Sequence, residues 1–171
     1  MERVSSIELA KKNEETEMEY YFQQAERSMN PVVKALFKEL AVEEHLHKKQ
    51  IETLHQKLTK DGSWPEDVPI EVDGTNIHSV LDGLLKEESP ATQLDYDDDD
   101  IAALTKAAKF EEKAAIFYTE LADACTNPQE EKFFRMLAGI EREHMISIKD
   151  SLFYLEDPQG WHEEKEGPNL Y

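Results

Sequence analysis

Two short motifs in this sequence combine residue types that can bind a metal ion. Glu44 is followed three positions later by His47, and the same Glu-x-x-His pair recurs 97 positions further on, at Glu141 and His144. Residues three apart lie on one face of a helix, so each pair would point a carboxylate and an imidazole in the same direction. A single pair of this kind is common on surface helices and indicates little by itself.

A further glutamate precedes each motif at the same distance. Glu14 and Glu111 lie 30 positions upstream of Glu44 and Glu141, respectively. All four glutamates interrupt apolar residues with helical spacing, as along the line Val33, Phe37, Leu40, Glu44, His47, Ile51 and Leu54. Such a line is expected to face the core of a helical bundle. We therefore expect four carboxylates and two imidazoles to meet inside a core.

This cluster would be unfavourable without compensation. Burying an unpaired carboxylate costs several kcal/mol, and clustered carboxylates repel one another and take up protons. No lysine or arginine lies in the apolar lines to pair with them. Two divalent cations would balance the four negative charges, and two neutral histidines would complete the coordination shells. Oxygen ligands with one imidazole per ion suit iron or manganese better than structural zinc.

The distribution of glycine and proline shows which elements must position these residues. Long stretches rich in Ala, Leu, Glu and Lys, almost free of Gly and Pro, predict four helices at about 4–29, 31–60, 99–126 and 128–156. Asn30-Pro31 and Asn127-Pro128 are short joints, which make antiparallel hairpins. We expect an all-α four-helix bundle domain over 1–157, with hairpins 4–60 and 99–156.

The remaining segments are a connection and a tail. The crossover 61–98 is long enough to span the bundle and carries a short amphipathic helix around 77–85, and residues 158–171 form a C-terminal tail. The acidic run 95–100 is expected to stabilise the N-terminus of the third helix, although a calcium site there is an alternative.

The two hairpins resemble each other in sequence. A shift of 97 residues aligns positions 14–47 with 111–144 without a gap and gives 11 identities in 34 positions. About two identities would be expected by chance at average composition. We interpret this as an internal duplication that relates the hairpins by a pseudo-two-fold axis.

Composition narrows the function classes. The chain has 171 residues, with 38 acidic and 19 basic ones, and a formal net charge of −19. This charge argues against nucleic-acid binding and docking on anionic membranes. Cys125 is the only cysteine, which excludes a disulfide framework and a multi-cysteine metal site. Met1–Ser6 lacks the apolar stretch of a signal peptide, so we expect a cytoplasmic protein.

The pattern resembles the rubrerythrin branch of the ferritin-like superfamily over about 4–161. The residues that carry the resemblance are Glu14, Tyr21, Glu44, His47, Glu111, Phe117, Tyr118, Glu141 and His144, together with the segment Leu155–Trp161. The resemblance implies a ferritin-like fold that binds two iron ions, oxo-bridged when oxidised, with manganese or zinc as alternative occupants. It also implies that Glu44 and Glu141 bridge the metals, while Glu14, Glu111, His47 and His144 are terminal ligands.

The function implied is a non-haem diiron oxidoreductase that reduces hydrogen peroxide or dioxygen. The alternatives are a ferroxidase or iron-storage module without a dedicated substrate, and a structural bundle with vestigial metals. Full-length rubrerythrins pass electrons through a four-cysteine rubredoxin domain, which one cysteine cannot form. The reductant would therefore be a separate donor protein or the site's own Fe(II). A homodimer paired through apolar helix faces is the expected assembly.

One departure from the family pattern bears on activity. Peroxidase-type rubrerythrins use an extra carboxylate one turn after the terminal glutamate of the third helix, where this sequence has Ala114. The pseudo-symmetric position in the first helix is Glu17, which is either an additional ligand or, by the interpretation we favour, a solvent-facing side chain. Tyr21 and Tyr118 either hydrogen-bond to the terminal carboxylates or are core aromatics.

The other candidates have ordinary interpretations. We expect His45 to be exposed, and His55, His78 and His162 have no partners at ligand spacing. Cys125 is interpreted as a small core residue. Trp64 and Trp161 are expected to anchor the crossover and the tail to the bundle or to a second subunit.

Overall fold

The computed structural model describes residues 3–64 and 98–166, and all its regular elements are α-helices. They are α1 (Arg3–Arg27), α2 (Pro31–Asp61), α4 (Asp98–Ala124), α5 (Pro128–Glu156) and α6 (Pro158–Glu166). The all-α prediction is thus confirmed. The first four helices match the predicted ones, although α1 and α4 each end two residues earlier than expected. The predicted short helix around 77–85 and most of the crossover lie outside the described residues.

The Asn-Pro joints fix the starts of α2 and α5. Asn30 is the N-cap of α2, and its side-chain oxygen accepts hydrogen bonds from the backbone N–H groups of Val32 and Val33. Asn127 caps α5 in the same way. In both joints proline occupies the first helical turn, where its missing N–H leaves no bond unmade. The two joints therefore turn the chain back within a few residues.

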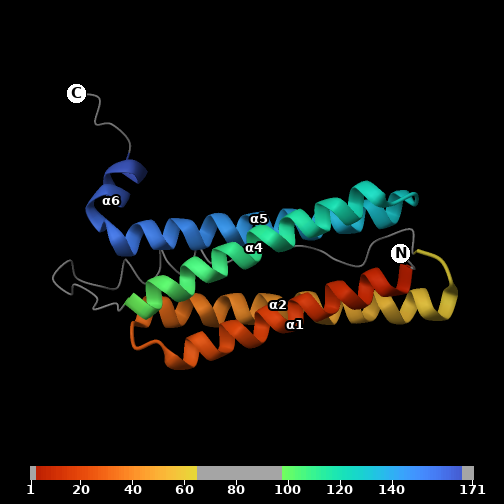
Figure 1. Cartoon of the computed structure of the whole chain (residues 1–171), viewed down its shortest axis with the longest axis horizontal. Helices are drawn as coiled ribbons and strands as arrows, with labels where there is room; N and C mark the ends of the chain where they lie inside the picture. The colour runs from red at the N-terminus through yellow and green to blue at the C-terminus, as the bar shows by residue number, and fades with distance from the viewer. Residues whose placement is uncertain (1–2, 65–97, 167–171) are drawn as a thin grey trace.

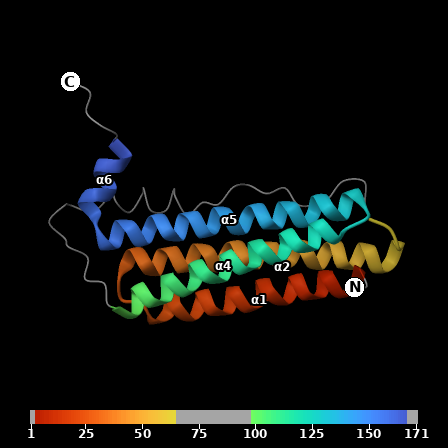
Figure 2. The same cartoon turned by 45° about the horizontal axis from the view of Figure 1, so that its top comes forward.

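The four long helices form two antiparallel hairpins, α1 with α2 and α4 with α5 (Figure 1). Figure 2 shows the two hairpins lying side by side along their length, with the end of α2 and the start of α4 at opposite ends of the bundle. At one end of α1 and α4, Arg27 pairs with the buried Asp100 at 2.8 Å. The last residue of the acidic run thus joins the two hairpins.

The apolar core is divided into two clusters. One contains Tyr21, Phe37 and Leu40, and the other contains Ile7 and Ile51. Along each helix the acidic positions fall between these clusters, since Glu14 lies between Ile7 and Tyr21 and Glu44 lies between Leu40 and Ile51. The middle of the bundle is therefore polar, and each end is apolar.

The start of the C-terminal tail is a helix, which we did not predict. Asp157 precedes α6, and the Gly160 N–H donates to Asp157 Oδ1 at 3.0 Å, which is N-cap geometry. Trp161 packs into the core, and its Nε1–H donates to Asp150 Oδ1 at 3.0 Å. This tryptophan anchors α6 to the end of α5, as expected of Trp161. Figure 1 shows α6 at that end of α5.

Gly62 ends α2 in the left-handed conformation, with φ of 67°, and its N–H bonds to the Leu58 carbonyl. Trp64 follows and packs on Phe133, which fixes the first residues after α2.

None of the helices in the described parts of the chain has the length and apolar character that crossing a membrane requires.

Candidate metal centre

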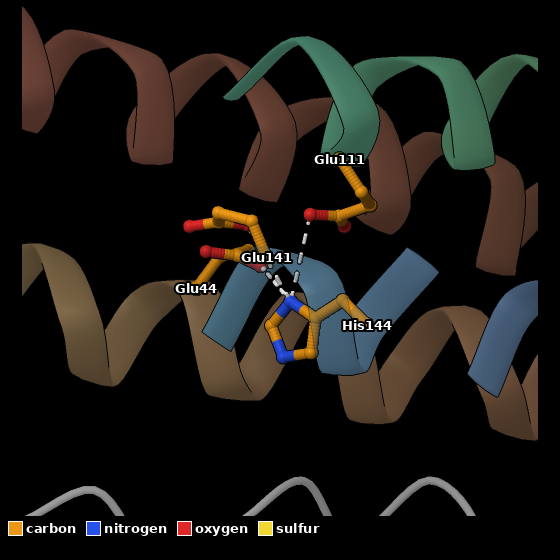
Figure 3. Close-up of side chains that lie close together, drawn as sticks. All are labelled: Glu44, Glu111, Glu141 and His144. Atoms are coloured by element: carbon orange, nitrogen blue, oxygen red, sulfur yellow. Dashed lines mark ion pairs between the residues drawn. The ribbon is translucent and has the colours of Figure 1, made fainter. Parts of the chain in front are cut away.

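The six predicted site residues come together in the polar middle of the bundle, one glutamate from each long helix and one histidine from α2 and from α5. Glu14, Glu44, Glu111, Glu141 and His144 are completely buried, and His47 is 8% exposed. In Figure 3 the carboxylates of Glu44, Glu111 and Glu141 point towards the imidazole of His144. The apolar spacing of each helix is what turns these side chains inward.

One half of the centre lies around His47. Its Nδ1 is 3.2 Å from Glu44 Oε2 and 3.4 Å from Glu14 Oε2. These three residues offer ligand atoms that all lie within 4.8 Å of one another. Two carboxylates and one imidazole therefore surround a single point between α1 and α2.

The other half lies around His144. Its Nδ1 is 3.0 Å from Glu44 Oε1, 3.6 Å from Glu111 Oε2 and 3.8 Å from Glu141 Oε2. Glu44 thus faces both histidines, one with each carboxylate oxygen. The two imidazole rings lie 5.7 Å apart between centroids, tilted by 25°. The arrangement is a pair of adjacent sites that share a carboxylate.

Two buried tyrosines hold the glutamates of α1 and α4. The Tyr21 hydroxyl donates a short hydrogen bond to Glu111 Oε1, and the Tyr118 hydroxyl donates to Glu14 Oε1 at 2.5 Å. Each tyrosine thus contacts the carboxylate of the opposite hairpin. The second oxygen of each carboxylate, Oε2, is left facing the histidine on its side.

The interpretation of Glu17 as solvent-facing is wrong. Its side chain is buried with 7% exposure, and it offers an oxygen within 4.8 Å of oxygens from Glu14, Glu44 and Glu141. The inward face of α1 runs from Glu14 through Glu17 to Tyr21, whereas Met18 is only half-buried. Ala114, at the equivalent position of α4, is short and leaves space beside Glu17.

Sequence reasoning missed Glu43. Its Oε2 lies 2.7 Å from Nε2 of His144, on the side of the ring away from the other carboxylates. A carboxylate in this place orients a histidine and raises its basicity as a ligand. A signal was present, because the 97-residue shift aligns Glu43 with Ile140, a core residue of α5. An acid at a position that is apolar in the other repeat is a candidate buried acid.

The pKa values show that bound protons partly neutralise the negative charge of the centre. Burial, followed by the charge of Glu44, raises the pKa of Glu14 to about 7. Burial and the neighbouring glutamates also hold the pKa values of Glu17 and Glu141 well above the usual range. Burial lowers the pKa of His47, but the adjacent carboxylates of Glu14 and Glu44 outweigh it and raise the value to about 10.

Glu44 behaves in the opposite way. Burial would raise its pKa, but His144 and His47 outweigh burial and hold the value well below the usual range. The charged forms thus concentrate on the shared carboxylate and on the two imidazoles. In the described part of the chain, the ion pairs of Glu14, Glu44, Glu111 and Glu141 are made with these histidines and not with lysine or arginine.

The arrangement of the ligand atoms suits binding of a cation better than hydrogen bonding among these side chains. Several buried ligand atoms in the described chain have no hydrogen-bond partner of acceptable geometry, namely Glu14 Oε2, Glu17 Oε2, Glu44 Oε1, Glu111 Oε2, both oxygens of Glu141 and His144 Nδ1. Buried polar atoms are normally satisfied. Here seven such atoms gather at one place, and they are carboxylate oxygens and an imidazole nitrogen, which are ligands of iron and manganese.

The other candidates of the sequence analysis lie away from the centre. His45 is exposed as predicted, and His162 is exposed on α6, whereas His78 lies outside the described residues. His55 is half-buried, 3.9 Å from Glu8. Cys125 follows α4 and packs against the core, and its thiol donates a hydrogen bond to the Leu121 carbonyl oxygen.

Comparison with protein families gives one match that covers the whole centre. The family model described as Rubrerythrin matches residues 6–147, more than half of the chain. Comparisons with curated proteins and with solved structures found no match. The matched range runs from the first turn of α1 to residue 147 in α5, and it contains the six predicted ligands and both tyrosines.

Proposed function

Because the chain belongs to the rubrerythrin family, we propose that it is a non-haem diiron oxidoreductase that reduces hydrogen peroxide or dioxygen. The observation that carries the proposal is the cluster of unpartnered buried carboxylate oxygens around two histidines. A cluster of this charge and burial has no structural use that an apolar core would not serve better.

Each residue has a role that follows from its contacts. Glu44 and Glu141 would bridge two iron ions, since Glu44 faces both histidines and Glu141 offers two unpartnered oxygens. Glu14 and Glu111 would each bind one ion through Oε2, and His47 and His144 through Nδ1. Tyr21 and Tyr118 hold the other oxygen of each terminal carboxylate, so that it presents one oxygen to the ion.

When bound, the iron pair would supply two electrons, one from each Fe(II), which matches the two electrons needed to convert hydrogen peroxide to two molecules of water. The protein excludes bulk water with the apolar clusters on both sides of the centre. Burial keeps the pKa values of Tyr21 and Tyr118 well above the usual range, so both hydroxyls keep their protons and continue to donate.

The reductant is a separate proposal. The 171 residues contain one cysteine and cannot form a four-cysteine rubredoxin site. We propose a separate electron-donor protein or, for a single turnover, the iron of the centre itself.

The expected homodimer stays a prediction, and sedimentation of the purified protein would test it.

Ala114 favours a second candidate, a ferroxidase or iron-binding module. The family resemblance places an additional carboxylate there in peroxidase-type members, and the alanine cannot supply it. A ferroxidase consumes Fe(II) and releases Fe(III), whereas a peroxidase keeps its iron over many cycles. Iron retention during repeated reduction and oxidation would distinguish the two.

The decisive experiment loads the metal-free protein with Fe(II) without oxygen and then mixes it separately with hydrogen peroxide and with dioxygen. We expect two iron ions per chain and oxidation by at least one oxidant faster than free iron. Glu141→Gln should lose iron, whereas Glu143→Gln, an exposed glutamate on the same helix, should not. Oxidation no faster than free iron with both oxidants would refute the enzymatic proposal.

A further inference from the structure

A cavity lies between α1 and α4, on the side of the bundle that carries no histidine ligand. Its volume is about 210 Å³, and it is lined by Asn13, Glu17, Phe110, Lys113, Ala114 and Phe117. Given that a water molecule occupies about 30 Å³ in the liquid, the cavity can hold a small molecule together with several waters. It joins the exposed Lys113 to the buried Glu17.

Glu17 connects this cavity to the metal centre. Its side chain lines the cavity, and a carboxylate oxygen lies within 4.8 Å of oxygens from Glu14 and Glu44. Glu17 Oε2 is buried and has no hydrogen-bond partner in the described chain. A molecule in the cavity therefore contacts a residue whose carboxyl group lies next to the proposed ligands.

The cavity exists because the duplication is broken at this position. The 97-residue shift aligns Glu17 with Ala114, and the two face the same cavity from α1 and α4. A long side chain at position 114 would occupy the space that the alanine leaves. On the opposite side of the centre, Glu43 closes the approach to His144, whose ring is completely buried.

We propose that this cavity is the binding and access site for hydrogen peroxide, and that Glu17 is the residue that holds the peroxide at its inner end. This inference rests on the proposed function, and it names the oxidant and its route. Peroxide is neutral, so the surrounding carboxylates do not repel it, and it is small enough for the cavity. It donates hydrogen bonds that the carboxyl group of Glu17, which lines the cavity, can accept, which dioxygen cannot do.

The first test fills the cavity, with a matched control on the same helix. Ala114 and Ala115 are adjacent and equally buried, with 4% exposure, but Ala115 lines a different cavity on the α4–α5 face that none of the centre's ligands borders. In the Fe(II)-loaded protein, we expect Ala114→Leu to slow the binding of nitric oxide, a neutral probe, by about an order of magnitude, because the probe must wait for side chains to move. Ala115→Leu should bind it at the wild-type rate.

Iron content and the melting temperature show whether each variant is intact. Ala114→Val, which adds less volume, should slow nitric oxide by an intermediate amount and provides the same test if Ala114→Leu does not fold. Wild-type rates of nitric oxide binding in an iron-replete Ala114→Leu or Ala114→Val variant would overturn the proposed route. This result is readable even if the wild-type protein oxidises with neither oxidant, which would instead refute the proposed function.

The second test concerns Glu17 as the peroxide-holding residue. Glu17→Leu should raise the KM for peroxide about fivefold, the effect of one lost hydrogen bond, while oxidation by dioxygen changes less. Glu17→Gln keeps a hydrogen-bonding oxygen and should restore the KM. Equal effects of Glu17→Leu on both oxidants, or an unchanged KM for peroxide, would overturn the assignment of Glu17.

Discussion

Replacing Glu14 by glutamine should stabilise the metal-free protein while weakening its metal binding. Glu14 is completely buried, and burial together with Glu44 raises its pKa to about 7. The folded protein therefore keeps a proton on Glu14 at pH values where the unfolded chain has lost it. Between pH 4.5 and pH 7 the folded state binds more protons, so rising pH favours unfolding.

The size of the effect follows from the pKa difference. The rise from 4.5 to about 7 corresponds to about 3 kcal/mol at pH 7 and about 1 kcal/mol at pH 5, at about 1.4 kcal/mol per unit. Glutamine has the shape of the protonated carboxyl and still accepts the hydrogen bond from Tyr118. The free energy of unfolding of Glu14→Gln relative to wild type should therefore grow by about 2 kcal/mol from pH 5 to pH 7.

Thermal unfolding of chelator-treated protein at the two pH values measures this difference. For a chain of this length, about 2 kcal/mol shifts the melting temperature by about 4–8 °C. Glu19→Gln, an exposed glutamate of the same helix, is the control and should show no such pH-dependent gain. A Glu14→Gln variant that is no more stable than wild type at pH 7 would show that the buried carboxylates are not in conflict, and the electrostatic argument for a cation would fail.

Three further predictions concern metal binding. Because the pKa of Glu14 is about 7 and that of His47 is about 10, Mn(II) or Fe(II) must displace protons from these residues when it binds. The metal affinity should therefore rise with pH between 6 and 8, and calorimetry in buffers of different ionisation enthalpy should detect proton release. Binding without proton release would contradict this prediction. Tyr118→Phe removes the donor to Glu14 Oε1 and should weaken metal binding about 10-fold or more in competition with a chelator. Glu43→Gln should weaken only the ion at His144, by about 10-fold, so that titration shows one weakened and one unchanged equivalent; equal loss of both would refute the local role of Glu43.

The ligand set could be predicted from sequence because two independent patterns agreed on it. The apolar spacing placed Glu44 and His47 on the buried face of α2, and the 97-residue repeat placed Glu141 and His144 in the same way. Both patterns can be read directly from the sequence. They require no knowledge of how the hairpins dock.

The sequence-based predictions failed at residues whose burial depends on how the two hairpins pack against each other. The orientation of Glu17 depends on how α1 is rotated against α4 and on the small size of Ala114, which lies 97 residues away in sequence. Glu43 is buried because His144 on the opposite hairpin lies above it. The helix α6 is a different case, since Asp157 before Pro158 is a helix-start signal that was present in the sequence and overlooked.

The crossed hydrogen bonds of the two tyrosines have a consequence for assembly and ancestry. Tyr21 reaches into the second hairpin and Tyr118 into the first, so neither repeat contains both a glutamate and the hydroxyl that holds it. A lone hairpin would therefore leave its carboxylates unsupported, and only two copies face to face could complete the arrangement. If the two hairpins arose by internal duplication, as we interpret their sequence similarity, the bundle corresponds to a symmetric pair of hairpins in which each half supplies the hydroxyl that binds the other half's glutamate.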